Sequence, residues 1–240
     1  MQILQGLYNE YLGTLKPSKR YVSPPAEFLR VVPDVIAIVE SPDNVNVAAK
    51  DFEHITSRFE QVVAEYIARQ RDHCAAIMKK TLEQYTGGDA KYPSDMFTRK
   101  DLHPVDLVES IWHHRYGWDW RLPRIVGWHS LTSHLYESMN PSYEIRPGVL
   151  VCAPGNPIFD YHTAQFASSL VSLVGALPYT ISAAQMDKRD DRFTCNCLME
   201  NGRMIFTWRS AVSPILPSHA FQCSLSCIDC TQPLVGCCQQ

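Results

Sequence analysis

The strongest pattern in the chain is the stretch 48–84, AAKDFEHITSRFEQVVAEYIARQRDHCAAIMKKTLEQ. Its apolar residues recur every three or four positions with charged residues between them, which is the period of an amphipathic α-helix. These apolar residues are Phe52, Ile55, Phe59, Val62, Val63, Tyr66, Ile67, Cys74, Ile77, Met78 and Leu82. A helix of this length would span about 55 Å, longer than a compact domain is wide. We therefore expect it either to bridge two parts of the molecule or to break near Gln70–His73.

Shorter helical patterns lie on both sides of this stretch. They cover residues 2–15, 25–39, 104–116 and 163–177. Pro17 ends the first of them, and Pro33 is expected to kink or divide the second, because proline lacks the N–H that a helix needs. Segment 125–139 is predicted to be either a helix or a strand leading into a helix. Ser182–Gln185 has the Ser-x-x-Gln spacing of a capping box, which predicts one more helix start.

One pair of strands is predicted near the C-terminus. Residues 192–197 and 204–211 alternate in polarity and contain Phe, Thr and Trp, which are common in strands. Between them lies Asn201-Gly202, a dipeptide typical of tight hairpin turns. Together these patterns predict an α+β fold that is mostly α-helical, with one small β-hairpin near the C-terminus.

The same patterns predict three regions. Residues 1–103 are expected to be a helical region dominated by the long helix at about 48–84. Residues 104–212 are expected to be an α+β region that contains the hairpin at 192–211. In residues 213–240, Pro, Ser and Cys dominate and no periodicity is visible. We expect this last part to be an irregular Cys-rich tail.

The composition is that of an ordinary soluble globular chain. Its 240 residues are 45% hydrophobic and 20% charged, and 22 basic against 25 acidic residues give a formal net charge of −3. This balance argues against binding to nucleic acid or to an anionic lipid surface. The apolar runs cover only a few residues, whereas a membrane-spanning helix needs about 20. Residues 1–20 lack the apolar centre of a signal peptide. We therefore expect no nucleic-acid partner and no membrane.

The cysteines indicate the compartment. Cys74 and Cys152 stand alone, whereas the other seven of the nine lie within the last 46 residues. A secreted disulfide scaffold spreads its bridges along the chain and begins with a signal peptide. The observed distribution instead favours a reducing compartment, and we expect a cytoplasmic or nuclear protein.

Some of the C-terminal cysteines are candidate zinc ligands. Cys195-x-Cys197 follows a predicted strand, and His219 with Cys223 would complete four ligands. Structural zinc sites usually combine two short-range pairs, and Cys227-x2-Cys230 has a more usual spacing but no clear second pair. The alternative is a set of free thiols. We expect no cofactor, with zinc at Cys195, Cys197, His219 and Cys223 as the alternative.

A second group of candidate ligands is formed by histidines among tryptophans. His113 and His114 are adjacent, while His129 and His134 would lie about one and a half helical turns apart and so would not share a face. No glutamate follows in the HExxH manner, and no carboxylate is placed to orient the imidazoles. We expect these histidines to pack against tryptophans, with a zinc-dependent enzyme using His113, His114 or His129 as the alternative. No phosphate-binding loop or nucleophile elbow is present, so we expect no enzyme.

Four short segments carry a resemblance to a known family. They are SLVSLVG (169–175), SAAQMD (182–187), RFTC (192–195) and TWRSAV (207–212). The chain resembles, over residues 50–212, an uncharacterised family of F-box-associated proteins from mushroom-forming fungi. The resemblance implies a role in recognising the substrates of ubiquitin ligases. Residues 1–60 contain no Leu-Pro-x-Glu-Ile-Leu type of F-box, so for this chain the resemblance implies a stand-alone, non-enzymatic protein-interaction module with an unknown protein partner.

Overall fold

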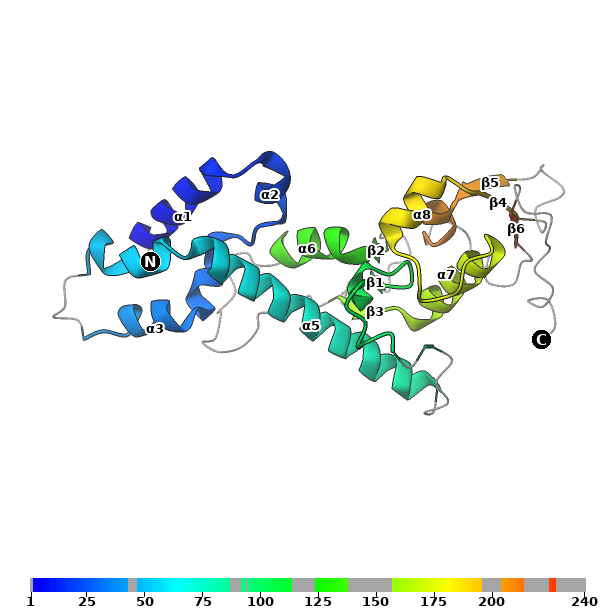
Figure 1. Cartoon of the computed structure of the whole chain (residues 1–240), viewed down its shortest axis with the longest axis horizontal. Helices are drawn as coiled ribbons and strands as arrows, with labels where there is room; N and C mark the ends of the chain where they lie inside the picture. Colours follow the sequence, from blue (N-terminus) through cyan, green and yellow to red (C-terminus); the bar gives the residue numbers. More distant parts are fainter. Residues whose placement is uncertain are drawn as a thin grey trace. The chain divides into compact units, whose positions relative to one another are not determined.

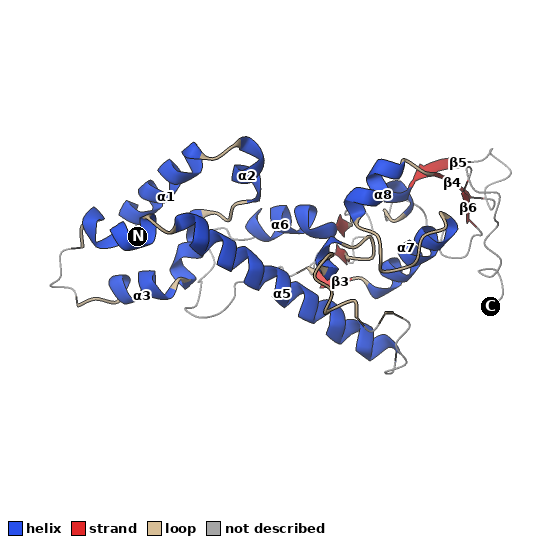
Figure 2. Ribbon diagram, viewed as in Figure 1, coloured by secondary structure: helices blue, strands red, loops and turns tan. Residues whose placement is uncertain are grey.

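The computed structural model describes residues 2–42, 47–86, 92–93, 95–113, 124–137, 157–195, 204–213 and 225–227. The chain divides into two compact units, the first made of Met1–His73 and Thr132–Asn156, and the second of Cys74–Leu131 and Pro157–Gln240 (Figure 1). Helices predominate, and both small antiparallel sheets belong to the second unit (Figure 2). The predicted mostly helical α+β class is confirmed.

The first unit is built from short helices. They are α1 (Gln2–Thr14), α2 (Pro17–Val22), the 3-10 helix η1 (Ala26–Val31), α3 (Pro33–Val39), the 3-10 helix η2 (Ala49–Phe52), α4 (Glu53–Thr56), the first part of α5 (Phe59–Thr86) and the end of α6 (Gly127–Glu137). The helix predicted at 2–15 is confirmed as α1. Pro33 is the first residue of α3 and follows η1, so the predicted division at Pro33 is also confirmed.

Aromatic rings join these helices into one core. The ring of Tyr8 on α1 meets Phe28 and Phe59 edge-on, with both centroids 5.3 Å away. Phe28 also packs against Tyr66 on α5, at a centroid distance of 5.0 Å. The Tyr8 hydroxyl donates a 2.8 Å hydrogen bond to the carbonyl of Pro24, so this fully buried phenol keeps a polar partner. The periodic apolar residues from Phe52 to Tyr66 therefore lie in the core of the first unit.

The long helix begins later than predicted. The sequence pattern starts at residue 48, but α5 begins at Phe59 and is preceded by η2 and α4. The hydroxyls of Thr56 and Ser57 donate to the carbonyls of Glu53 and His54, and such local bonds compete with continued helix. From Phe59 onwards the helix is unbroken through residues 70–73 and contributes residues to both units. The helix α5 therefore joins the two units, which is one of the two alternatives predicted from the sequence.

The second unit contains the two sheets and the helices around them. Its elements, in chain order, are the end of α5, η3 (Pro104–Asp106), β1 (Ile111–His113), β2 (Ile125–Val126), the start of α6 (Gly127–Glu137), β3 (Ile158–Phe159), α7 (Tyr161–Leu173), α8 (Ala183–Arg189), β4 (Arg192–Cys195), β5 (Met204–Thr207), α9 (Trp208–Ala211) and β6 (Leu225–Cys227). The strand orders are β2-β1-β3 and β5-β4-β6, with all pairs antiparallel. The strand leading into a helix, expected as one alternative at 125–139, is confirmed by β2 and α6.

The predicted helix at 104–116 is wrong. This segment forms the short helix η3 and then β1, the central strand of the first sheet. Trp112 on β1 is fully buried, packs edge-on against Phe159 at 5.5 Å and donates from its indole nitrogen to the hydroxyl of Ser110. A short apolar run has no periodicity that separates a buried strand from a buried helix. The sheet partners, which come from distant segments, decide the outcome.

The predicted hairpin is confirmed as β4 and β5, but Trp208–Ala211, expected to continue the second strand, form the helix α9 instead. Phe193 pairs with Phe206, and Arg192 pairs with Thr207. The turn dipeptide at 201–202 lies outside the described residues. A third strand, β6, lies on the other side of β4 within the segment 213–240, where the sequence predicts no element, so the backbone of Cys227 is paired with Phe193. The strand-like run at 149–152 also lies outside the described residues.

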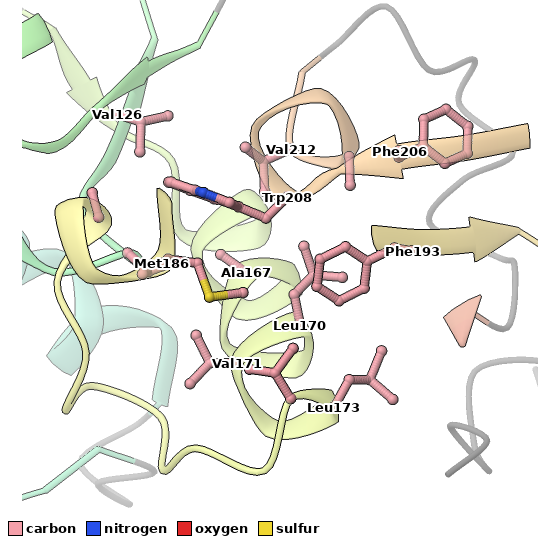
Figure 3. Packing of buried hydrophobic residues seen from close by; sticks show 14 of the residues in the cluster. Val126, Ala167, Leu170, Val171, Leu173, Met186, Phe193, Phe206, Trp208 and Val212 are labelled. Atoms are coloured by element: carbon pink, nitrogen blue, oxygen red, sulfur yellow. The ribbon is translucent and has the colours of Figure 1, made fainter. Parts of the chain in front are cut away.

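The helix α7 forms the centre of the core in the second unit. Its residues Ala167 and Leu170 are fully buried and face Met186 of α8 and Trp208 of α9 (Figure 3). The helix was predicted at 163–177 and is observed at Tyr161–Leu173, because Asp160 caps its start through the amide of Thr163. Among the described helices, none has a run of apolar residues long enough to cross a membrane.

Candidate functional site

A cleft in the second unit lies between the starts of two helices. Its volume is about 660 Å³, within the range of about 300–1,000 Å³ that ligand-binding clefts occupy. Its lining residues come from four separate segments of the chain. They are Leu102, Asp106, Val126, Gly127, Trp128, His129, Ser130, Ser182, Ala183, Ala184, Asp187 and Arg209. It is partly open to solvent, so a ligand can enter without unfolding of the unit.

The first turn of α6 forms one wall of the cleft. Gly127 begins this helix with a φ of +71°, a left-handed conformation that glycine adopts without steric cost. Its N–H donates a 2.9 Å hydrogen bond to the carbonyl of Ser110, which ties the helix start to the segment before β1. A Cβ atom at this position would lie 3.3 Å from the Cβ of Ala183. The glycine therefore allows the two helix starts to approach closely.

The start of α8 forms a second wall of the cleft. The hydroxyl of Ser182 accepts from the amide of Gln185, and the Gln185 side chain accepts from the amide of Ser182 at 2.8 Å. This is the capping box that the sequence predicts, and it is confirmed. The capping box fixes the direction in which the chain enters α8, and so the positions of Ala183 and Ala184. The two small side chains leave room for the cleft.

An acid–base pair lies at one side of the cleft. Arg209 donates to both carboxylate oxygens of Asp187, each at 2.8 Å, and the indole N–H of Trp208 donates to the same carboxylate at 2.9 Å. The guanidinium carbon of Arg209 also lies 4.7 Å from the centre of the Trp208 ring. Hydrogen bonding to Arg209 lowers the pKa of Asp187, so this carboxylate is ionised at neutral pH. The hydrogen bonds that the Asp187 carboxylate accepts from Trp208 and Arg209 hold α8 against α9.

The cleft combines aromatic and aliphatic walls with an excess of acid. Trp128, Val126 and Leu102 supply apolar surface, and two aspartates face one arginine among the described lining residues. Asp187 is paired with Arg209, and Asp106 contributes a second acidic side chain to the lining. This arrangement can hold a chain segment with an apolar part and one positive charge.

The candidate zinc ligands fall mostly outside the described residues. Cys197, His219 and Cys223 are not described. Cys195 ends β4, where its backbone pairs with Met204 on one side and Leu225 on the other. Within the described part of the chain, no group of three His, Cys, Asp or Glu side chains is arranged to hold a metal ion. The zinc site therefore stays a prediction.

The histidines of the second candidate group lie in different elements. His113 ends β1, where it pairs with Ile158, and His129 lies in the first turn of α6. His129 lines the cleft, whereas His113 does not. His114 lies outside the described residues.

No family, curated protein or solved structure matches this chain.

Sequence reasoning missed most of the residues that form the cleft. Asp187 and Arg209 both lie in segments that carry the fungal resemblance, SAAQMD and TWRSAV, but nothing in either segment indicates that they pair. Glu109, which is fully buried, was also missed. A signal for Glu109 does exist, because it is the one charged residue in the apolar run from Leu107 to Trp112. Burying a charged side chain in such a run costs free energy unless the charge is paired or neutralised. The position of Glu109 in the run therefore predicts a buried carboxyl group with a nearby partner.

Proposed function

We propose that this chain is a non-enzymatic protein-interaction module, and that the cleft of the second unit receives a segment of its partner that carries a lysine or arginine beside an apolar residue. The observation that carries the proposal is the cleft itself, whose lining combines the apolar side chains of Trp128 and Val126 with the acidic side chain of Asp106. The resemblance to the F-box-associated fungal family implies the same class of function. The cysteine distribution places the proposed action in the cytoplasm or nucleus.

The polar groups of the cleft support recognition in preference to proton transfer. A general acid or base works best with a pKa near the working pH. Asp187 instead has a lowered pKa and donates no proton at neutral pH, because Arg209 and Trp208 hold its carboxylate. The Asp187 carboxylate therefore stays ionised and in one position, and a bound segment meets it always in the same place and charge state.

The charge of the cleft supports a cationic partner segment. Arg209, the one arginine among the described lining residues, is engaged with Asp187 through two hydrogen bonds. Asp106 contributes an acidic side chain to the lining, and a lysine ammonium or an arginine guanidinium of the partner would meet it as an opposite formal charge. An acidic segment would meet Asp106 as a like charge.

A peptide-display selection on the purified full chain tests this function. We expect the selected peptides to share a lysine or arginine next to an aromatic or aliphatic residue. Binding should be lost in Ala184→Trp, where an indole occupies the cleft, and kept in Leu177→Trp, whose site is 73% exposed and does not line the cleft. Enrichment of acidic peptides, or equal binding by Ala184→Trp, would contradict the proposal.

The charge of Asp106 can be tested separately. Replacement by asparagine keeps the size of the side chain and removes its charge, and we expect the affinity for a selected peptide to fall about fivefold. Asp95→Asn is the matched control, because Asp95 is exposed and does not line the cleft. If both variants bind equally well, the cationic part of the proposal is wrong.

A structural zinc module is the second candidate function. It is favoured by the pairing of β6 with β4, which brings the backbone of Cys227 next to the strand that ends in Cys195. Metal analysis of the purified chain tests it. One tightly held zinc that is lost in Cys195→Ser would support the module, and a metal content unchanged by this substitution would contradict it.

A further inference from the structure

Glu109 is a buried carboxyl group with an incomplete set of partners. It lies between η3 and β1 and is fully buried. Its Oε1 accepts a 2.9 Å hydrogen bond from the backbone N–H of Tyr179. Its Oε2 is buried and has no hydrogen-bond partner among the described residues. A carboxylate needs several donors or a cation to be stable in such a place, whereas a protonated carboxyl needs far less.

The partner of Glu109 lies in a loop whose conformation needs support. Residues 174–182 connect α7 to α8, and Tyr179 in this loop has a φ of +58°. For a side chain as bulky as tyrosine this left-handed conformation costs about 1–2 kcal/mol. The hydrogen bond to Glu109 holds the amide, and the ring is fixed by a 2.9 Å bond from Gln165 to its hydroxyl. The loop is therefore held at Tyr179 through both the backbone N–H and the side-chain hydroxyl of this residue.

The same loop delivers one wall of the cleft. The carbonyl of Ile181 accepts from the amide of Val108, and Ser182 forms an isolated antiparallel bridge with Leu107. These contacts lie directly beside Glu109 in sequence and lead into Ser182–Ala184, which line the cleft. A change at Glu109 is thus transmitted over a few bonds to the start of α8.

The described surroundings of Glu109 provide no positively charged partner. Among the described residues, no lysine, arginine or histidine forms an ion pair with it or acts on its carboxylate. The ionisable group that interacts with it is the phenol of Tyr179, whose pKa is raised by burial. The phenol of Tyr161 also acts on that of Tyr179, and the ring of Tyr92 packs against the ring of Tyr179. Burial raises the pKa of Glu109 from 4.5 to about 7. Ionisation then falls within the pH range that cells experience.

We propose that Glu109 is a proton-sensitive latch: its protonated side chain fastens the loop 174–182 and the wall of the cleft that this loop delivers, and loss of the proton releases both. The released carboxylate is stabilised by water, which the closed loop excludes. The latch concerns the protein alone, so it stands or falls independently of the partner proposed above.

Hydrogen exchange of the full chain tests the latch without any ligand. Protection factors of the amides in 175–182, corrected for the intrinsic effect of pH, are compared at about pH 5.5 and about pH 8. With a carboxyl pKa near 7 when closed and 4.5 when open, we expect protection to fall about 30-fold over this range. Amides of Leu7 and Tyr8 on α1, in the first unit, serve as an internal reference and should change much less. Equal changes in the loop and in α1 would overturn the proposal.

Two variants separate the latch from a general effect of pH. Glu109→Gln keeps the acceptor for the Tyr179 amide and cannot ionise, so its loop protection should stay constant with pH. Glu83→Gln makes the same chemical change at an exposed site and should behave as the unmodified chain. A carbon-13 titration of the unmodified chain gives a test that needs no variant, because the Glu109 carboxyl signal and loop protection should change over the same pH range. Different ranges, or a pH-dependent loop in Glu109→Gln, would contradict the latch.

Discussion

The backbone N–H of Tyr179 donates a 2.9 Å hydrogen bond to Oε1 of Glu109, which lies 70 positions earlier in the chain. This bond joins the segment before β1 to the loop between α7 and α8. Both residues are buried, and the tyrosine has left-handed backbone geometry. A single titratable group thus supports the segment that leads into the cleft, and several consequences for stability follow.

The stability of the second unit should fall as the pH rises from about 5.5 to about 8. The pKa of Glu109 is raised in the folded state, so its contribution is complete below 4.5 and is lost as the pH passes through about 7. The expected loss over this range is about 2 kcal/mol. Urea unfolding followed by tryptophan fluorescence measures it, because all five tryptophans belong to the second unit. In Glu109→Gln this loss should be absent, and an equally steep decline in that variant would contradict the assignment.

Gly127 and Gly175 should differ in their tolerance of alanine. Both have φ values above +70°, so each substitution incurs about 1 kcal/mol of backbone strain. Only at Gly127 would the new Cβ meet a neighbour, at 3.3 Å from Ala183. We expect Gly127→Ala to lower the free energy of unfolding by about 1 kcal/mol more than Gly175→Ala. Thermal unfolding of both variants decides, and equal losses would show that the two helix starts do not constrain each other.

Leu170 and Leu177 provide a matched test of the core. Leu170 on α7 is fully buried, whereas Leu177 in the following loop is 73% exposed. Leu170→Ala should lower the free energy of unfolding by about 2–5 kcal/mol, because the substitution leaves a cavity between α7, α8 and α9. Leu177→Ala should have an effect below about 0.5 kcal/mol. A small loss at Leu170 would mean that α7 is not the centre of this core.

Much of the local structure could be predicted from the sequence. The capping box at Ser182–Gln185, the division at Pro33 and the strands of the hairpin each depend on a few neighbouring residues. The helix predicted at 104–116 failed because Trp112 gains its burial from strands at 125–126 and 158–159. No short-range pattern contains that information.

The candidate site could not be predicted for a related reason. Its walls come from segments near 102–106, 126–130, 182–187 and 209, so the cleft exists only once the second unit has folded. The metal ligands proposed from sequence depend on residues that the structure does not describe, and they stay a prediction. Of the candidate histidines, His129 lies in the cleft wall.

Asp187 should make a small contribution to stability that disappears in acid. Its pKa is lowered by Arg209, so the contribution is present above the ordinary value of 3.8 and is lost as the pH falls below it. Both side chains are over two-fifths exposed, which limits the pair to about 0.5 kcal/mol at neutral pH. Asp187→Asn should therefore destabilise slightly at pH 7 and not at all in strong acid. Asp101→Asn, at the pair with Arg99, is the control and should change less, because the Asp101 side chain is 68% exposed.

The most direct test of the proposed cleft is the affinity of one selected cationic peptide for three forms of the full chain. These are the unmodified chain, Ala184→Trp and Leu177→Trp, measured by titration calorimetry under one set of conditions. The account predicts that Ala184→Trp weakens binding at least tenfold, about 1.4 kcal/mol, while Leu177→Trp leaves it unchanged. Binding that survives in Ala184→Trp as well as in Leu177→Trp would contradict the cleft as the binding site.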